Sequence, residues 1–189
     1  THYMSERGLK PGLEYRYYLT REAKGALLFD FLHDGQVDDG RDRSSDDWGY
    51  DDGSGVFFRP NHDRYWFRMS HTNPLPAGFR GHVDLDVVSD QDYLRDFKKG
   101  YMGFEETELF LKNFMGRTLD DFDDPVRTNR LQVDRRWSKA YLSAGTLLYD
   151  DVRKGQNRKE FTQRLPVVRF NAPKQKVLDS TFFYNLQSE

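Results

Sequence analysis

The sequence has 189 residues and no cysteine, so it can form neither a disulfide nor a thiolate metal site. It has no apolar run near the roughly 18 residues that a transmembrane helix needs. A net charge of -2 gives no basic field for nucleic acid. Nucleophile elbows, Gly-rich phosphate loops and paired-histidine metal motifs are also missing. We therefore expect no cofactor, no metal site, no catalytic residue and no nucleic-acid partner: the protein is not predicted to be an enzyme.

The mean hydropathy is low, at -0.89, and 32% of the residues are charged, as in solvated or disordered chains. The aromatic content of 15% argues against disorder, because such rings need burial in a core or in lipid. A barrel strand alternates apolar and polar residues over about 9–11 positions, so its average hydropathy also stays low. A membrane protein built from strands therefore remains compatible with this composition.

Segments with an apolar period of two recur between turn-forming residues, which predicts antiparallel strands. The expected strands are 13–20, 26–34, 65–71, 79–89, 126–137, 140–152, 161–170 and 178–189. Residues 1–8 are expected to supply the end of a ninth. The break after 71 is placed at 73–76, which contains two prolines, and a short helix is expected at 105–115.

Charged side chains occupy the polar faces of these strands, and either bulk water or a wet barrel lumen would tolerate them. The residues alone thus leave two architectures open, a soluble sandwich and a transmembrane barrel. In the barrel, one face of each strand meets lipid and the other meets the lumen. The expected lipid-facing residues are Leu13, Tyr15, Tyr17, Leu27, Phe29, Phe31, Phe79, Val83, Leu85 and Val87. The expected lumen-facing residues are Glu14, Arg16, Asp84 and Asp86.

Two acidic stretches, 38–52 and 120–124, invite a calcium-binding interpretation. Their spacing does not match an EF-hand loop, and solvated loops are the favoured explanation. Asp84 and Asp86 could suggest a glycosidase pair, but carboxylates two residues apart are common on polar strand faces. Neither pattern changes the prediction that the protein has no catalytic or metal site.

Several strings resemble the outer-membrane LPS-assembly family LptD, also called the organic solvent tolerance family. Residues 1–8 are similar to its "TPxYMxxRG" segment and residues 14–19 to its "EFRYL" strand. Residues 88–97 are similar to its "VSDxxYFxDF" element, and 131–137 and 163–166 also match barrel segments. The strings follow the family order. The resemblance implies an all-β fold, an antiparallel up-and-down meander that forms part of a transmembrane β-barrel.

The same resemblance implies a component of the cell outer membrane that transports lipopolysaccharide (LPS) and inserts it into the outer leaflet. Residues 1–189 would be a partial barrel domain, with the N-terminal periplasmic jelly-roll, the remaining strands and the lateral gate outside the chain. An LptE-like plug lipoprotein and, through the missing jelly-roll, the periplasmic LPS-transport bridge are the implied partners. The alternative is a soluble β-sandwich module that binds carbohydrate.

The expected connections alternate in length along the chain, and bacterial barrels have short periplasmic turns and long extracellular loops. This alternation of short and long connections predicts on which side of the membrane each connection lies. The extracellular connections are expected at 35–63, 90–125 and 153–160, and the periplasmic ones at 21–25, 72–77, 138–139 and 171–177.

Overall fold

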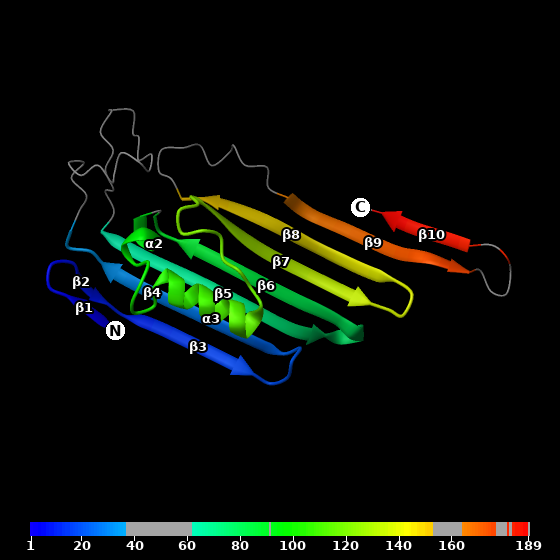
Figure 1. The fold of residues 1–189 in the computed structure, drawn as a ribbon, viewed down its shortest axis with the longest axis horizontal. Coiled ribbons are helices and arrows are strands. Elements are labelled where there is room, and N and C mark those ends of the chain that lie inside the picture. Colours follow the sequence, from blue (N-terminus) through cyan, green and yellow to red (C-terminus); the bar gives the residue numbers. More distant parts are fainter. Residues whose placement is uncertain (37–61, 91, 153–163, 177–180, 182, 189) are drawn as a thin grey trace, which may run out of the picture.

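The computed structural model describes residues 1–36, 62–90, 92–152, 164–176, 181 and 183–188. Eight strands pair as antiparallel sequence neighbours in one sheet, which confirms the predicted meander (Figure 1). The strands are β3 (Gly12–Tyr18), β4 (Lys24–His33), β5 (Asp63–Leu75), β6 (Phe79–Val88), β7 (Val126–Arg136), β8 (Tyr141–Asp151), β9 (Arg164–Lys176) and β10 (Phe183–Ser188). Within the described residues no second sheet faces this one, so the sandwich alternative finds no support in the fold.

The N-terminal segment does not add a ninth strand to the sheet, as we had expected of residues 1–8. Instead, β1 (His2–Met4) and β2 (Gly8–Lys10) form a separate two-stranded hairpin. Gly8 has a φ of 114°, which a residue with a side chain rarely adopts, and the chain reverses just before it. The hairpin is tied to the end of β4 through a hydrogen bond from the Gly35 amide to the Arg7 carbonyl, at 2.8 Å.

Two strands run well beyond their predicted C-terminal ends, and each extension contains a proline. Strand β5 continues through Pro74 to Leu75, and Pro74 lies opposite Arg80 of β6. Pairing of β5 with β4 has already ended at Thr72, so beyond that point β5 has one neighbour and Pro is tolerated as on an edge strand.

The second correction concerns β9, which runs through Pro173 to Lys176 instead of ending at 170. The predicted turn at 171–177 is therefore wrong, and the connection to β10 spans 177–182. Both proline-containing segments pair with a neighbour, so the alternating pattern extends further than the proline positions indicated.

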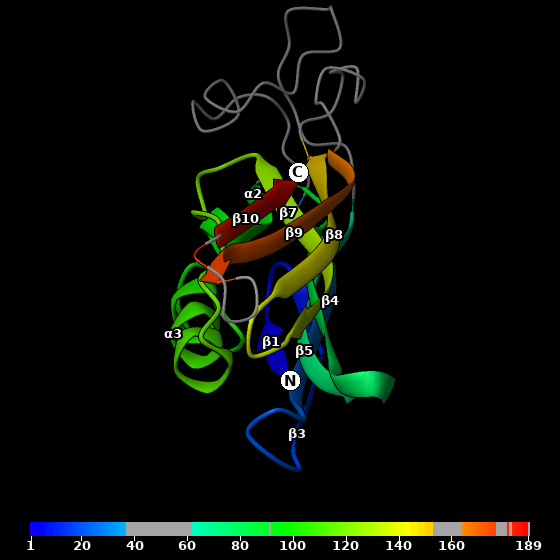
Figure 2. The same ribbon diagram turned by 90° about the vertical axis from the view of Figure 1, so that its right-hand side faces the viewer.

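A helical insertion, residues 89–125, connects β6 to β7 and contains α2 (Asp92–Asp96) and α3 (Phe104–Met115). The predicted helix at 105–115 is confirmed as α3. Its buried residues Phe104, Thr107 and Leu111 follow the spacing of one helical face. It ends at Gly116, whose φ of 76° is the left-handed conformation of a helix C-cap. Figure 2 shows α3 standing on one side of the twisted sheet.

The main hydrophobic core lies between this insertion and the sheet. It includes Leu28 and Leu32 of β4, Trp66 of β5 and Leu111 of α3, all of which are buried. Trp66 stacks on Phe104, with the ring centroids 6.0 Å apart. The insertion is thus packed against strands β4 to β6 along much of their length, rather than standing free of the sheet.

Connections of the two length classes lie at opposite ends of the sheet, as the antiparallel order requires (Figure 1). The short ones are 19–23, the turn η1 (Pro76–Gly78), 137–140 and 177–182. The longer ones are 34–62, 89–125 and 152–163. The predicted alternation is therefore present, while the acidic stretch 38–52 and most of 153–160 lie outside the described residues.

Candidate functional site

The sheet has two chemically different faces, which we call the covered face, packed against the insertion, and the open face. Residues directly opposite each other in adjacent antiparallel strands lie on the same face. The pairs Leu13–Phe29, Phe29–Phe67 and Phe67–Val87 therefore place one apolar row across four strands. The register puts all ten residues expected to face lipid on the open face: Leu13, Tyr15, Tyr17, Leu27, Phe29, Phe31, Phe79, Val83, Leu85 and Val87.

The open face exposes large apolar side chains instead of packing them. Leu13 and Tyr15 are each 59% exposed, and Leu131 and Val168 are 49% and 52% exposed further along the sheet. Contiguous exposed apolar surface of this kind marks a site that contacts lipid or another protein. The helices of the insertion pack on the other face of the sheet (Figure 2).

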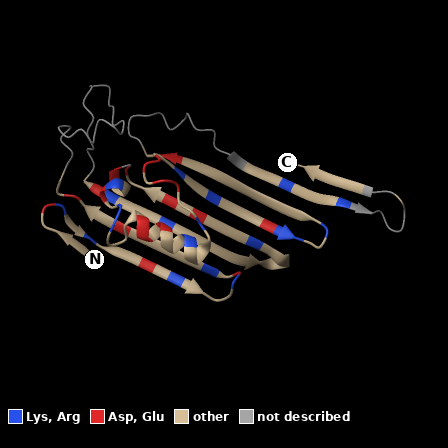
Figure 3. Ribbon diagram, in the orientation of Figure 1, with Lys and Arg blue, Asp and Glu red and all other residues tan. Residues whose placement is uncertain are grey.

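The four residues expected to face a lumen all lie on the covered face. Glu14 forms an ion pair with Arg16, whose guanidinium lies 3.8 Å from the ring centroid of Phe110 in α3. Asp84 accepts a hydrogen bond of 2.6 Å from the Ser70 hydroxyl. These placements agree with the predicted sharing of a face. Glu14 and Arg16 are exposed there, whereas Asp86 is completely buried. Figure 3 shows how acidic and basic residues interleave along β3 to β7 and the insertion.

The first of three buried charge clusters surrounds Arg64 of β5. Its Nε and Nη2 donate to the two carboxylate oxygens of Asp90, at 3.0 and 2.6 Å. Its Nη1 donates to Asp34 at 3.0 Å and to Asp96 at 2.7 Å. Arg7 of the hairpin joins the same two carboxylates, each at 2.6 Å. Two guanidinium groups that share two carboxylates therefore join the hairpin, the end of β4, β5 and α2.

A second cluster is centred on Asp30 of β4, whose side chain is fully buried. Arg68 of β5 donates to one of its oxygens, and the Tyr93 hydroxyl of α2 donates to the other. Lys10 lies 3.0 Å from that second oxygen. Arg68 also reaches the Thr107 hydroxyl in α3, at 3.4 Å. Both helices are thereby joined to the same strand pair.

The third cluster places Asp86 of β6 between a ring nitrogen and a guanidinium. Trp66 Nε1 donates to Asp86 at 2.7 Å, and Arg127 Nε and Nη2 donate at 3.0 and 2.5 Å. Arg127 further donates to the backbone carbonyls of Asp120 and Asp121, at 3.1 and 2.7 Å. This cluster fastens the C-terminal end of the insertion to the sheet.

The charges shift the proton affinities of groups outside the strands. Burial alone would raise the pKa of Asp34, but hydrogen bonds from Arg7 and Arg64 and the Arg7 charge lower it below its ordinary value. Burial, and then the nearby Asp30 carboxylate, raise the pKa of Tyr93 well above its ordinary range. Asp34 is therefore ionised and Tyr93 protonated around neutrality, as the ion pairs and the Tyr93 hydrogen bond require.

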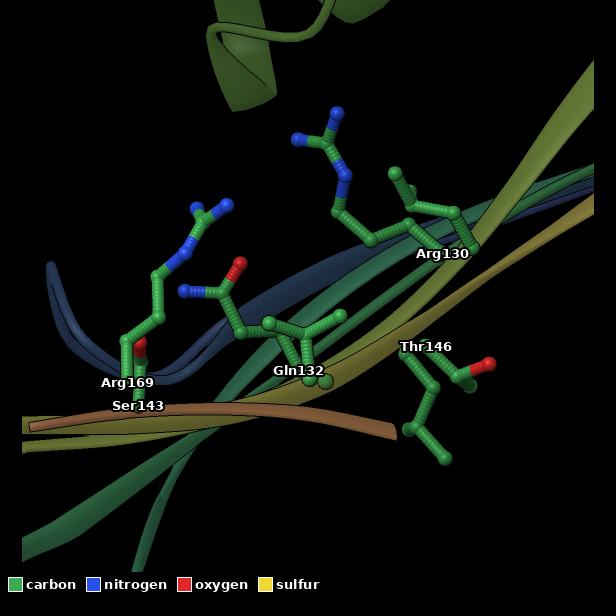
Figure 4. A pocket seen from close by; sticks show the side chains of 9 residues that line it. Arg130, Gln132, Ser143, Thr146 and Arg169 are labelled. Atoms are coloured by element: carbon green, nitrogen blue, oxygen red, sulfur yellow. The ribbon is translucent and has the colours of Figure 1, made fainter. Parts of the chain in front are cut away.

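Beyond the three clusters, the covered face is hollowed along β7. One cavity of about 560 Å³ lies between the end of α3 and strands β5 to β8, and its lining includes Asp84, Arg117 and Arg130. A second, of about 300 Å³, lies where the β8–β9 register shifts between Gly145 and Leu147. Figure 4 shows the second cavity, with Arg130, Gln132 and Arg169 pointing to the same side of the strands. Arg130 and Leu147 line both cavities.

Most residues of the three buried charge clusters were not predicted from the sequence, although one string of residues contained several of them. Asp90, Tyr93 and Asp96 all belong to the string 88–97, which the sequence offered only as a family resemblance. The structure shows a physical reason for their positions, because each of the three bonds a charged residue of the sheet. Arg64 and Asp34 gave no such signal, since each stands beside a turn or loop in the sequence.

No helix among the residues described is both long and apolar enough to cross a membrane. In the same residues, no group of three or more His, Asp or Glu side chains is placed to hold a metal ion. The covered face therefore combines a hydrophobic core, three clusters of buried charges and two cavities.

Comparisons with known proteins agree with the motifs. A family model described as LptD, LPS transport system D, matches residues 62–189. An LPS-assembly protein LptD of Pseudoalteromonas translucida (strain TAC 125) is 32% identical over 131 residues, 69% of this chain. Those of Pseudoalteromonas atlantica (strain T6c) and Salmonella typhimurium (strain LT2) are 29% and 28% identical over 57% and 70% of the chain. The chain spans only 12–15% of the length of these relatives. Because the family model covers well over half of the chain, the protein belongs to the LptD family.

Proposed function

We propose that this chain forms part of the wall of an outer-membrane β-barrel that transports LPS and inserts it into the outer leaflet. The open face contacts lipid, and the covered face lines the lumen. The remaining strands and a periplasmic jelly-roll domain belong to the rest of the barrel protein, as the 12–15% coverage of its relatives suggests. The protein acts by conducting and positioning its substrate, and no catalytic step is assigned to it.

The observation that carries this proposal is the distribution of apolar and charged side chains between the two faces. A soluble sheet would bury its apolar face against a second layer and leave the charges in water. Here Leu13, Tyr15 and Leu131 are exposed on the open face, whereas Arg64 and Asp86 are completely buried on the covered face. Such a sheet is stable where lipid covers the apolar face.

The proposed partners are those that the family resemblance implies. An LptE-like plug lipoprotein would contact the lumenal face next to the insertion, and the LPS-transport bridge would join through the jelly-roll. The longer connections, including the insertion, would be extracellular, and the turns such as η1 periplasmic. These assignments make the cell outer membrane the site of action.

The experiment that tests the proposal places arginine on each face of β6 in the complete barrel protein. Leu85→Arg should cost about 2–4 kcal/mol if the site lies near the bilayer midplane, and should reduce insertion into the outer membrane. His82→Arg is the matched control, since His82 lies on the covered face with Asp134 as a partner 2.9 Å away. Normal insertion of Leu85→Arg, together with failure of His82→Arg, would overturn the assignment of faces.

A further inference from the structure

We propose that Arg135, which contacts the rings of Phe79 and Trp137 on the open face, binds the phosphate of a phospholipid headgroup. The lipid belongs to the periplasmic leaflet of the membrane, on the side where the short turns would lie. This inference rests on the proposed function, because it requires the open face to contact the membrane. It adds one defined lipid contact to that function.

Arg135 is the one charged member of an otherwise apolar row on the open face. The row consists of Leu75, Phe79, Arg135, Leu142 and Phe170, in that order from β5 to β9. Leu75 is the last residue of β5 and Phe79 the first of β6, so the row lies next to η1, at what we call the turn end of the sheet. Arginine on a lipid-facing strand is costly at the bilayer midplane and costs little at its boundary. The position therefore suits a side chain whose charged head reaches the headgroups.

The guanidinium of Arg135 is held by aromatic rings. Its Cζ atom lies 4.5 Å from the ring centroid of Trp137 and 5.3 Å from that of Phe79. Attraction of a cation to the face of a ring uses none of the N–H donors of the guanidinium. Arg135 is only half-buried, and Trp137 is 38% exposed. The rings thus fix the position of the cation at the surface and leave its hydrogen-bonding capacity unused.

The fold provides no carboxylate for this guanidinium among the residues that the structure describes. Asp134, its neighbour in sequence, lies on the covered face and there accepts hydrogen bonds from Arg80 at 3.0 Å and His82 at 2.9 Å. Arg64, by contrast, donates to both oxygens of a buried carboxylate. The donors of Arg135 are therefore available to a ligand, and their planar fork matches the oxygens of a phosphate.

The two ends of β7 differ in the sign of their charge. At the turn end, residues 76–82 and 134–141 contain one acidic residue, Asp134, and four that are Lys or Arg: Arg80, Arg135, Arg136 and Lys139. The connection that precedes β7 instead contains the acidic stretch 120–124. Basic residues at a membrane boundary attract anionic headgroups. The turn end thus combines a general attraction for anionic lipid with one specific donor group.

The test measures which lipids surround the turn end in the complete barrel protein. The protein, free of other cysteines, would carry a fluorophore at Ser138→Cys in phosphatidylcholine liposomes. Two quencher-labelled lipids with the same acyl chains are compared: phosphatidylglycerol, which has the phosphodiester, and diacylglycerol, which lacks it. The wild type should prefer phosphatidylglycerol. Arg135→Gln should reduce this preference about tenfold, the size expected for one charge-assisted hydrogen bond.

Arg136→Gln is the matched control, because it removes the same charge from the next residue of β7. Successive side chains of a strand point to opposite faces, and Arg136 contacts Tyr141, its partner in β8. This variant should keep the wild-type preference. Arg135→Lys keeps the charge and loses the fork, so it should recover part of the preference and guards against a folding defect.

Equal losses in Arg135→Gln and Arg136→Gln would overturn the proposal, since only the total positive charge would then matter. An unchanged preference in Arg135→Gln would also overturn it. Displacement of phosphatidylglycerol by water-soluble glycerol phosphate would do the same, because the ligand would then be a free phosphate. In these cases membrane lipid still quenches the label, and the proposed barrel stands. Absence of quenching by either lipid would refute both the phosphate contact and the lipid-facing assignment of the open face.

Discussion

Arg64 and Asp90 form a bidentate ion pair whose two side chains are both completely buried. Arg64 lies near the start of β5, and Asp90 is the second residue of the insertion. The pair therefore fixes the insertion to the sheet at the point where it leaves β6. Burying two charges is costly, and only their mutual attraction and hydrogen bonds compensate for it.

Removing one partner of this pair should release the insertion. Asp90→Ala leaves Arg64 without its bidentate partner, which for a buried pair costs about 3–5 kcal/mol. Amide hydrogen exchange of α3 should become faster by a corresponding factor. The matched control is Asp123→Ala: Asp123 pairs with Arg95 at 3.2 Å, but its side chain is 51% exposed. Loss of such a surface pair costs about 0–1 kcal/mol. Equal exchange rates in the two variants would contradict the anchoring role of Asp90.

Acid should weaken the ion pairs that Asp34 forms with Arg7 and Arg64. The pKa of Asp34 lies below its ordinary value of 3.8, so the carboxylate is more acidic in the folded protein than in the unfolded chain. Its contribution to stability is complete above about pH 4 and is lost as the pH falls through the folded-state pKa. The protection factors of the amides near Arg7, measured relative to the unfolded chain at the same pH, should therefore fall below about pH 4.

Two substitutions test whether the Asp34 carboxylate causes this acid effect: one removes its charge, and the other, a control, removes the charge of an exposed carboxylate. Asp34→Asn should show weaker protection already at neutral pH and a flatter response to acid. Asp63→Asn, at an exposed carboxylate that pairs with His33, should keep the wild-type acid response. An unchanged acid response in Asp34→Asn would assign the effect to other groups.

Topology can be read from epitope tags in the complete protein. A tag at Ser45, in the connection 34–62, should be labelled on intact cells. A tag after Ala77, in the turn η1, should be labelled only after the outer membrane is opened. Asn73 also lies in the connection predicted at 72–77, but it is unsuitable for a tag because it belongs to β5 and pairs with Gly81 of β6. Labelling of Ala77 but not Ser45 would mean that the barrel is inverted.

The sequence predicted the meander, and it predicted which residues share a face of the sheet, because both depend on a local period of two. Leu85 and Asp84 lie on opposite faces as soon as β6 is a strand. Strand ends were predicted less well, since Pro74 was taken as a terminator. Its tolerance depends on where β4 stops pairing, which is a property of the neighbouring strand.

The buried charge clusters could not be predicted from periodicity. Asp30 and Arg68 are recognisable as charges within strands, but a lumen or solvent was expected around them. Their burial results from α2 and α3 folding back onto the sheet, with Tyr93 reaching Asp30 from 63 residues away. Contacts at that separation leave no trace in the local sequence pattern.

A cysteine scan along β6 tests the central claim, that the open face contacts lipid and the covered face a lumen. This segment contains no cysteine, so each introduced thiol can be labelled alone once the rest of the barrel protein is free of cysteine. A fluorophore would be attached at positions 82, 83, 84, 85 and 87 of the protein in liposomes. We predict quenching by a lipid-borne quencher at Val83, Leu85 and Val87 and by an aqueous quencher at His82 and Asp84. Uniform quenching, or the reverse alternation, would contradict the account.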